Sequence, residues 1–277
     1  MVSVTRVLFG EPPRDSPAGR ACRGRTERRE LELPTNFETD RANRRTAIIV
    51  GALFLISYAG VFIGSAVTGG VVDSDYLLNA FPDRAQLTMG TLIELVNDLA
   101  VIGIAVLLYP FLRKASEGVA LFYVGLRILE GAFFMVAKVS TLALVDVSED
   151  YLAAGTAEAA SYERMGELAL AMRDAANVIA TISFIIGGIA LYYLLLRSEL
   201  VPRFISIWGF VAIASLIAAN VFGVPDLTQT FEPAMLLYLL IVANELFLAG
   251  WLIVKGFNAP AIESEPPVPS QRELTYT

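Results

Sequence analysis

The chain alternates between long apolar stretches and short polar connections. Six stretches are long enough to cross a bilayer as helices, because a span needs about 20 mostly apolar residues. They are Thr46–Val67, Leu87–Leu112, Val119–Val145, Asn177–Leu196, Arg203–Phe222 and Pro233–Phe257. The connections leave no room for a sizeable soluble domain. The pattern therefore predicts an all-α fold, a polytopic transmembrane helix bundle of six spans that occupies residues 46–257.

One further helix is expected outside the spans. Between residues 156 and 174, apolar side chains recur at helical spacing. They are Tyr162, Met165, Leu168, Ala169 and Met172. This spacing predicts an outer amphipathic helix before span four, lying in the membrane interface over the bundle. A lid over a cavity is the alternative interpretation.

The two ends of the chain have the composition of tails. Residues 1–45 are rich in Arg and Pro, and residues 258–277 are rich in Pro, so both are predicted to be disordered. The first tail lacks the short apolar stretch that a cleaved secretory signal contains. Its arginines would attract anionic lipid. Apart from this lipid and the bilayer itself, the sequence indicates no partner, and nothing in it points to nucleic acid.

Composition and charge agree with a membrane protein. Hydrophobic residues make up 55% of the 277 residues, and the mean hydropathy is +0.59. Basic residues next to spans stay on the cytoplasmic side. They occur before span one, between spans two and three, between spans four and five, and after span six, as Arg44, Arg45, Arg113, Lys114, Arg197, Arg203 and Lys255. This distribution predicts that both termini are cytoplasmic.

Absent residue types narrow the chemistry. The chain has no His, and its one cysteine, Cys22, lies in the first tail. Imidazole or thiolate metal sites, haem ligation by His and His-based acid–base catalysis are therefore excluded. No nucleotide-binding or hydrolase motif is present. The sequence predicts no cofactor, no metal site and no catalytic residue.

Polar and ionisable residues nevertheless occur deep within three spans. Span two holds Glu94, Asn97 and Asp98, span three holds Arg127, Glu130 and Lys138, and span six holds Asn244 and Glu245. At 100° per residue, the members within spans two and three share one helix face. Ionisable groups at this depth are costly, so each is a candidate functional residue. We expect these stripes to face protein or water instead of lipid.

Depth within the bilayer predicts which groups meet. Spans two and three are joined by about six residues, so they are antiparallel neighbours. Counting 1.5 Å per residue from their shared loop puts Glu94 level with Lys138. The same count puts Glu245 level with Arg127 and Glu130. We therefore expect Glu94–Lys138 and Arg127–Glu245 contacts, with Asp98 and Glu130 near the midplane.

Several stretches, taken together and in order, resemble one known family. They are Asn43–Gly51, Leu107–Pro110, Gly125–Glu130, Leu200–Gly209 and Asn244–Phe257. The sequence resembles the bacterial membrane proteins grouped as domain of unknown function 4386, from about Asn43 to Asn258. The resemblance implies six spans in the bacterial inner (plasma) membrane, and it implies no activity. Arg127, Glu130 and Glu245 fall within the matching stretches, whereas Asp98 and Lys138 do not.

Three functions fit a buried polar network of four acids and two bases. An accessory or structural membrane protein, the preferred interpretation, would use it to join helices, with every group sealed in a pair. A small permease or proton-coupled transporter is the alternative, because surplus buried carboxylates take up protons or bind cations. It predicts a water-accessible cavity that reaches Glu245 or Asp98. An intramembrane enzyme, with Asp98 and Glu94 as its acid–base pair, ranks last.

Overall fold

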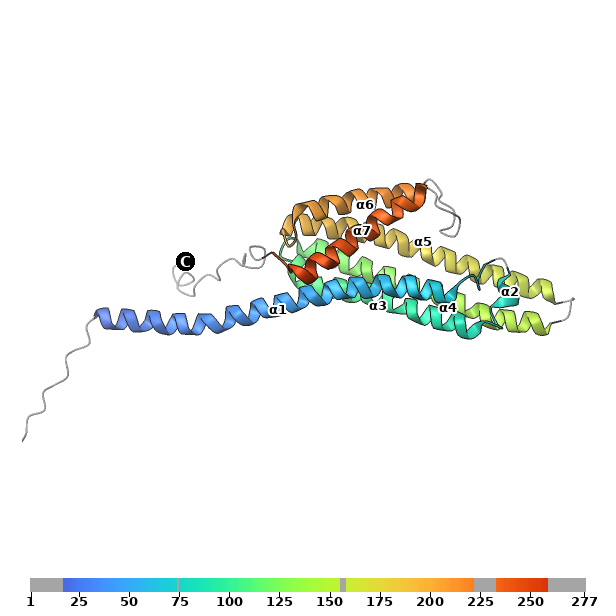
Figure 1. Ribbon diagram of the computed structural model, residues 1–277, viewed down its shortest axis with the longest axis horizontal. Coiled ribbons are helices and arrows are strands. Elements are labelled where there is room, and N and C mark those ends of the chain that lie inside the picture. Colours follow the sequence, from blue (N-terminus) through green and yellow to red (C-terminus); the bar gives the residue numbers. More distant parts are fainter. Residues whose placement is uncertain (1–16, 74, 155–157, 222–232, 259–277) are drawn as a thin grey trace, which may run out of the picture. The chain divides into compact units, whose positions relative to one another are not determined.

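The computed structural model describes residues 17–73, 75–154, 158–221 and 233–258, and over these ranges it contains helices and no strand. The helices are α1 (Pro17–Thr68), α2 (Tyr76–Asn79), α3 (Arg84–Leu112), α4 (Glu117–Ala153), α5 (Ala159–Ser198), α6 (Arg203–Val221) and α7 (Pro233–Val254) (Figure 1). All but α2 contain a stretch long and apolar enough to cross a membrane. The predicted six-span helical bundle is confirmed.

The first helix begins earlier than the sequence predicted. α1 starts at Pro17, whereas a disordered tail was expected over residues 1–45. Arg, Glu and Leu, which are frequent in this segment, all favour helix in the absence of tertiary contacts. The part of the chain before Arg45 forms one unit, and Arg45–Thr277 forms a second that contains the bundle. Residues 1–16 and 259–277 lie outside the described residues, as do the side chains on which the predicted lipid contact of the first tail depends.

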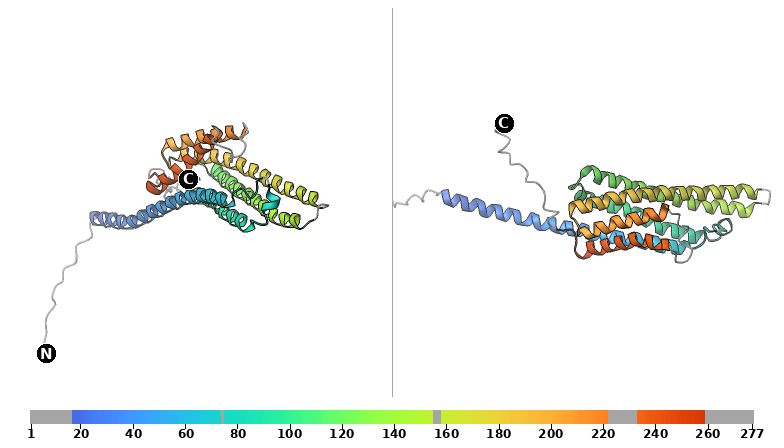
Figure 2. Two further views of the ribbon diagram at one scale, coloured as in Figure 1. Left: turned by 45° about the vertical axis from the view of Figure 1, so that its right-hand side comes forward. Right: turned by 90° about the horizontal axis from the view of Figure 1, so that it is seen from above.

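Consecutive helices of the bundle pack as neighbours. α3 ends at Leu112 and α4 begins at Glu117, so the short connection makes them antiparallel, as predicted. α4 then packs along α5, α5 along α6, and α6 along α7 (Figure 2). This order brings α4 between α3 and α5, where its polar stripe can be covered from two sides.

α4 and α5 are longer than a membrane crossing requires. They have 37 and 40 residues, or about 55–60 Å at 1.5 Å per residue, against a hydrocarbon core of about 30 Å. Their shared end extends past the ends of α6 and α7 (Figures 1 and 2). The short helix α2 is held against this extension, because Ser148 of α4 donates a hydrogen bond of 2.7 Å to the carbonyl of Leu77 and accepts one of 3.0 Å from the backbone N–H of Phe81.

The amphipathic segment before span four is helical, as predicted, and leads directly into that span. It is the first part of α5, which runs without interruption from Ala159 to Ser198. The segment and span four form one continuous helix, and its arrangement along the membrane interface stays a prediction. Gly166 in this segment lies directly against Tyr76 of α2, so one face is covered by protein. On the other face, Met165, Leu168 and Met172 are exposed.

Small residues bring α1 and α3 together. A Cβ built at Gly64 would lie 2.8 Å from the carbonyl oxygen of Gly90, and one at Gly60 would lie 3.2 Å from that of Ile93. A Cβ at Gly90 would overlap the Thr68 side chain. Glycine is needed at these positions because only its missing side chain lets the two backbones approach so closely. This seam places Ser57 and Tyr58 of α1 beside the polar stripe of α3.

The apolar core is divided into two clusters. The larger one contains Leu108 and Leu112 of α3 with Tyr123 of α4, and the smaller one contains Leu87 of α3 with Leu144 of α4. Along both helices the ionisable residues of the predicted polar network fall between the two clusters. Many large apolar side chains, mostly Leu, Ile, Val, Phe and Met, face outward, as expected for surface in contact with lipid. The polar layer thus lies between the two apolar clusters.

Candidate functional site

Arg127 of α4 is the centre of a buried group of three charges. Its Nη1 donates hydrogen bonds of 2.9 and 3.2 Å to the two carboxylate oxygens of Glu130, one helical turn later. Its Nη2 lies 4.0 Å from Oε1 of Glu245 on α7. All three residues are at most 5% exposed. The predicted Arg127–Glu245 contact is confirmed, but Glu130 is the nearer partner of the guanidinium.

Glu245 has its closest polar contact with α1. The hydroxyl of Tyr58 donates a hydrogen bond of 2.8 Å to Oε2 of Glu245. The sequence interpretation did not include Tyr58, since a tyrosine within a span is an ordinary side chain there. Its position near the middle of span one, beside Ser57 and close to a glycine seam, is the signal that could have found it. We name Arg127, Glu130 and Glu245 the Glu245 triad.

A second group of three charges surrounds Lys138 of α4. Lys138 Nζ lies 3.0 Å from Oδ2 and 3.2 Å from Oδ1 of Asp98, and 3.8 Å from Glu94. Asp98 is completely buried, whereas 29% of the Glu94 side chain is exposed. The predicted Glu94–Lys138 contact is confirmed, and Asp98 is the closer partner. We name Lys138, Asp98 and Glu94 the Lys138 triad.

Asn97 lies between the two triads. Its amide oxygen accepts a hydrogen bond from Ser57, and its amide nitrogen donates one of 3.3 Å to Asp98. Close contact of α3 with α4 is possible here because Gly131 has no side chain: a Cβ there would lie 3.0 Å from the carbonyl oxygen of Asp98. Glycine next to Glu130 therefore sets the spacing at which the two polar stripes face each other.

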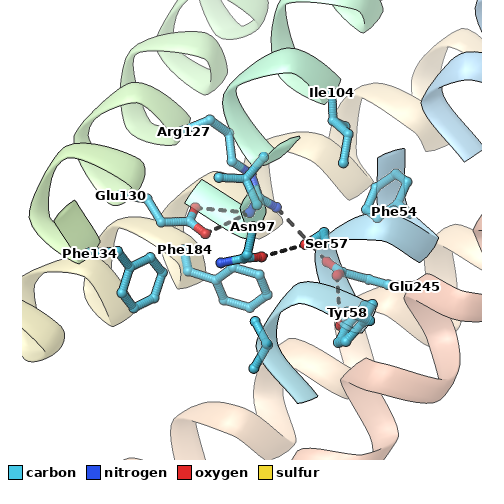
Figure 3. A pocket seen from close by; sticks show the side chains of 12 residues that line it. Phe54, Ser57, Tyr58, Asn97, Ile104, Arg127, Glu130, Phe134, Phe184 and Glu245 are labelled. Atoms are coloured by element: carbon cyan, nitrogen blue, oxygen red, sulfur yellow. Dashed lines mark hydrogen bonds and ion pairs between the residues drawn. The ribbon is translucent and has the colours of Figure 1, made fainter. Parts of the chain in front are cut away.

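A cavity of about 160 Å³ reaches the Glu245 triad (Figure 3). The carboxylates of Glu130 and Glu245, the Arg127 guanidinium, the Tyr58 and Ser57 hydroxyls and the Asn97 amide form its polar part. Its remaining lining is apolar, from Phe54, Val61, Val101, Ile104, Phe134 and Phe184. We name it the Glu245 cavity. It draws on five helices, which explains why no single sequence motif marks it.

A second cavity, of about 280 Å³, reaches the Lys138 triad from the α4–α5 end of the bundle. Hydroxyl, amide and charged groups dominate its lining: Ser65, Thr68, Asp73, Thr91, Glu94, Lys138, Thr141, Arg173 and Asn177. We name it the Lys138 cavity. Glu94 and Lys138 belong to it, while Asn97 belongs to the Glu245 cavity. Asp98 is buried between these residues.

One predicted site residue lies elsewhere. Asn244 accepts a hydrogen bond of 2.7 Å from the Tyr192 hydroxyl of α5 and donates one of 3.1 Å to the carbonyl of Ile205 in α6. It is fully buried and lines neither cavity. Its amide joins three helices, α5, α6 and α7.

The charges of each triad do not balance. Each has two carboxylates and one base, so each carries one surplus negative charge when all groups are ionised. An unmatched buried charge is so costly that the group takes up a proton or binds a cation. In the part of the chain that is described, no three acidic residues or Cys lie close enough together to hold a metal ion. The chemistry available to the triads is the exchange of protons or of monovalent cations.

Comparison with known proteins gives a family and no closer relative. Neither the search of curated proteins nor the search of solved structures found a match. The family described as "Domain of unknown function (DUF4386)" matches residues 49–256, which include both triads and reach from within the first span to the end of the sixth. The chain is therefore a multi-pass membrane protein that belongs to the DUF4386 family.

Proposed function

We propose that this protein is a small permease of the proton-coupled kind, and that the Glu245 triad carries the proton. The observation that carries this proposal is the Glu245 cavity, which reaches three ionisable side chains in the middle of the bundle. A carrier needs space at a buried charge, because the substrate must reach the group that binds the proton. The proposal reverses the preference that the sequence alone gave to an accessory role.

The accessory role predicts a polar network without a cavity. Hydrogen bonds between membrane helices contribute only about 0.6 kcal/mol on average. Joining helices therefore requires neither six ionisable residues nor space beside them. Asn244 joins three helices through a neutral amide, and it lines neither cavity. The triads are built differently from this joint.

Two cavities on either side of a polar layer suit alternating access. The Lys138 cavity reaches Glu94 and Lys138, and Lys138 pairs with Asp98. Asn97 contacts Asp98 and lines the Glu245 cavity. Polar groups therefore follow one another from one cavity to the other. We infer that the Lys138–Asp98 pair closes the route between the cavities in this state, and that movement of Lys138 opens it.

The proposal includes an orientation and a location. Basic residues next to span ends favour the cytoplasmic side for the α3–α4 connection and for both termini. The Lys138 cavity, at the opposite end, would then open to the outside of the cell. Family membership supports a bacterial inner membrane, and the arginines before the first span would attract its anionic lipid.

Proton movement in proteoliposomes tests the proposal. Purified protein is reconstituted, a pH-sensitive dye is enclosed, and a panel of small metabolites is added outside. Wild-type protein should change the internal pH with at least one metabolite, and Glu245→Gln should not. Exposed Glu163→Gln, on the extension of α5, is the matched control and should behave as wild type. Leak-level flux with every metabolite in the wild type would contradict a proton-coupled carrier and favour the accessory role.

A further inference from the structure

We propose that the Glu245 cavity binds a small organic monocation, of amine or quaternary ammonium type, in exchange for one proton. This inference rests on the proposed function and adds the substrate class. It follows from three properties of the cavity: which carboxylate is left without a matched base, what its walls are made of, and how large it is.

Glu245 is the carboxylate whose charge is unmatched. Arg127 directs Nη1 to both oxygens of Glu130, at 2.9 and 3.2 Å, and its other amino group is 4.0 Å from Glu245, beyond hydrogen-bond length. The close partner of Glu245 is the neutral Tyr58 hydroxyl. Glu130 is thus the close partner of the guanidinium, and we assign the one surplus negative charge of the triad to Glu245, the more distant partner.

The walls suit a cation with an apolar body. Phe54, Tyr58 and Phe134 bring aromatic rings to the cavity, and Val61, Val101 and Ile104 bring aliphatic groups. Aromatic faces attract cations within about 6 Å of the ring centre, and more strongly where water is excluded. The fourth ring, Phe184, is already occupied by Arg127, whose guanidinium carbon lies 4.8 Å from the ring centre, and Lys138 Nζ lies 5.5 Å from the centre of the Phe134 ring. Phe54 and Tyr58 are therefore the rings that face a new cation. Alkylammonium ions find both charge and apolar contact in such a lining.

The size of the cavity limits the ligand. A volume of 160 Å³ is close to that of a cavity of about 150 Å³ known to hold benzene. Ligands of roughly five or six non-hydrogen atoms therefore fit without rearrangement. Tetramethylammonium has five such atoms and tert-butanol has the same number without the charge. These two probes separate the contribution of charge from that of shape.

Exchange follows from the single surplus charge. Either a proton on Glu245 or a bound monocation neutralises it, and the two cannot do so together without leaving a positive charge buried. Binding of the cation therefore breaks the O–H bond of the protonated carboxyl, and the proton leaves to water. The other titratable groups around Glu245 are Tyr58 of α1, Tyr123, Arg127 and Glu130 of α4, and Tyr192 of α5. The tyrosines and Arg127 keep their protons at neutral pH, which leaves the carboxyls as the source.

Proton release on binding tests the inference. Purified full-length protein in detergent is titrated with tetramethylammonium chloride in weakly buffered solution, with heat and released protons measured together. We expect about one proton released per cation bound at acidic pH, and apparent affinity that rises up to tenfold per pH unit where Glu245 loses its proton. tert-Butanol should bind at least tenfold more weakly and release no proton. Glu245→Gln should lose proton release, while Glu163→Gln should keep it.

A second variant guards against misfolding of Glu245→Gln. Val61 lines the cavity at the lipid-facing side of α1 and is 38% exposed, so Val61→Phe reduces the space without removing a charge. It should weaken tetramethylammonium binding at least tenfold and leave the thermal unfolding temperature near that of the wild type. Equal binding of both probes without proton release, or binding of propionate in place of tetramethylammonium, would overturn the inference. Proton release on binding with no flux in vesicles would uphold it and overturn the carrier proposal.

Discussion

Tyr58 of α1 and Glu245 of α7 are 187 residues apart in the chain and share a hydrogen bond of 2.8 Å. This bond ties the first span to the last at the carboxylate that we propose exchanges its proton. Because the hydroxyl is the donor, the strength of the bond depends on whether Glu245 is ionised. The pair therefore reports the charge state of the site.

Tyr58→Phe should destabilise the protein by an amount that depends on pH. A hydrogen bond to a charged group contributes about 1.5–3 kcal/mol, and a neutral one between membrane helices about 0.6 kcal/mol. The loss should thus be small at pH 5 and several-fold larger at pH 9, because the bond strengthens when Glu245 gives up its proton. Unfolding free energies from denaturant titration in micelles measure it. Tyr193→Phe, at an exposed hydroxyl that accepts a bond from Arg197, is the control and should change little. The same loss at every pH would show that Glu245 does not titrate in this range.

Lys138→Met should destabilise the protein strongly. Asp98 is completely buried and Lys138 is its cation at 3.0 Å. Removing one member of a buried pair typically costs about 3–5 kcal/mol, since the other charge is left uncompensated. The double variant Lys138→Met/Asp98→Asn should recover a large part of the loss, which double-mutant unfolding measurements would detect. A single variant as stable as the wild type would contradict a stabilising ion pair between Lys138 and Asp98.

Substitution in the glycine seam should separate α1 from α3. A Cβ at Gly64 would lie 2.5 Å from the Cγ of Glu94 and 2.8 Å from the carbonyl of Gly90. Gly64→Val should therefore cost about 1–3 kcal/mol of stability, as overpacking does, and should weaken proton-coupled exchange by shifting Tyr58. Gly125→Ala is the matched control, because no atom lies within 4 Å of the added Cβ. It should be neutral or slightly stabilising. Equal effects of the two substitutions would argue against the close packing of α1 on α3.

Cysteine labelling tests the Lys138 cavity and its orientation. In a Cys22→Ser background, Thr141→Cys places a thiol in the cavity lining, and Val139→Cys places one on a 67% exposed apolar position. A membrane-impermeant thiol reagent added to intact cells should modify position 141 and leave position 139 unmodified. Modification of position 141 only in inverted vesicles would reverse the proposed orientation. If the reagent modified position 141 neither in intact cells nor in inverted vesicles, the cavity would be closed to water.

The fold was largely predictable from the sequence because hydrophobic length alone decides what can cross a bilayer. The boundaries were less predictable where helices leave the membrane. The apolar stretch of α4 ends at Val145, but the helix continues to Ala153. The apolar stretch of α5 starts at Asn177, but the helix already begins at Ala159. Both extensions form because the two helices cover each other outside the bilayer. Hydropathy does not report such support from a partner helix.

The site was predictable in its members and only partly in its pairs. Equal depth correctly placed Glu94 with Lys138, because the short α3–α4 connection fixes the register of these two helices. Equal depth also placed Arg127 with Glu245 of α7. Depth cannot rank partners at the same level, so the closer bonds of Arg127 to Glu130 and of Lys138 to Asp98 were not singled out. Helix rotation was not predictable either. Asn244 and Glu245 are consecutive residues of α7, yet its rotation turns Asn244 toward Tyr192 and Glu245 toward Tyr58.

Exchange across a membrane tests the central claim most directly. Proteoliposomes are loaded with tetramethylammonium and a pH-sensitive dye, and diluted into cation-free medium at the same pH. With wild-type protein, outward movement of the cation should drive protons inward and acidify the lumen, without any ionophore, because the exchange is electroneutral. Vesicles with Glu245→Gln should keep their internal pH, and vesicles with Glu163→Gln should acidify as the wild type does. A lumen that stays at its starting pH with wild-type protein would contradict the account.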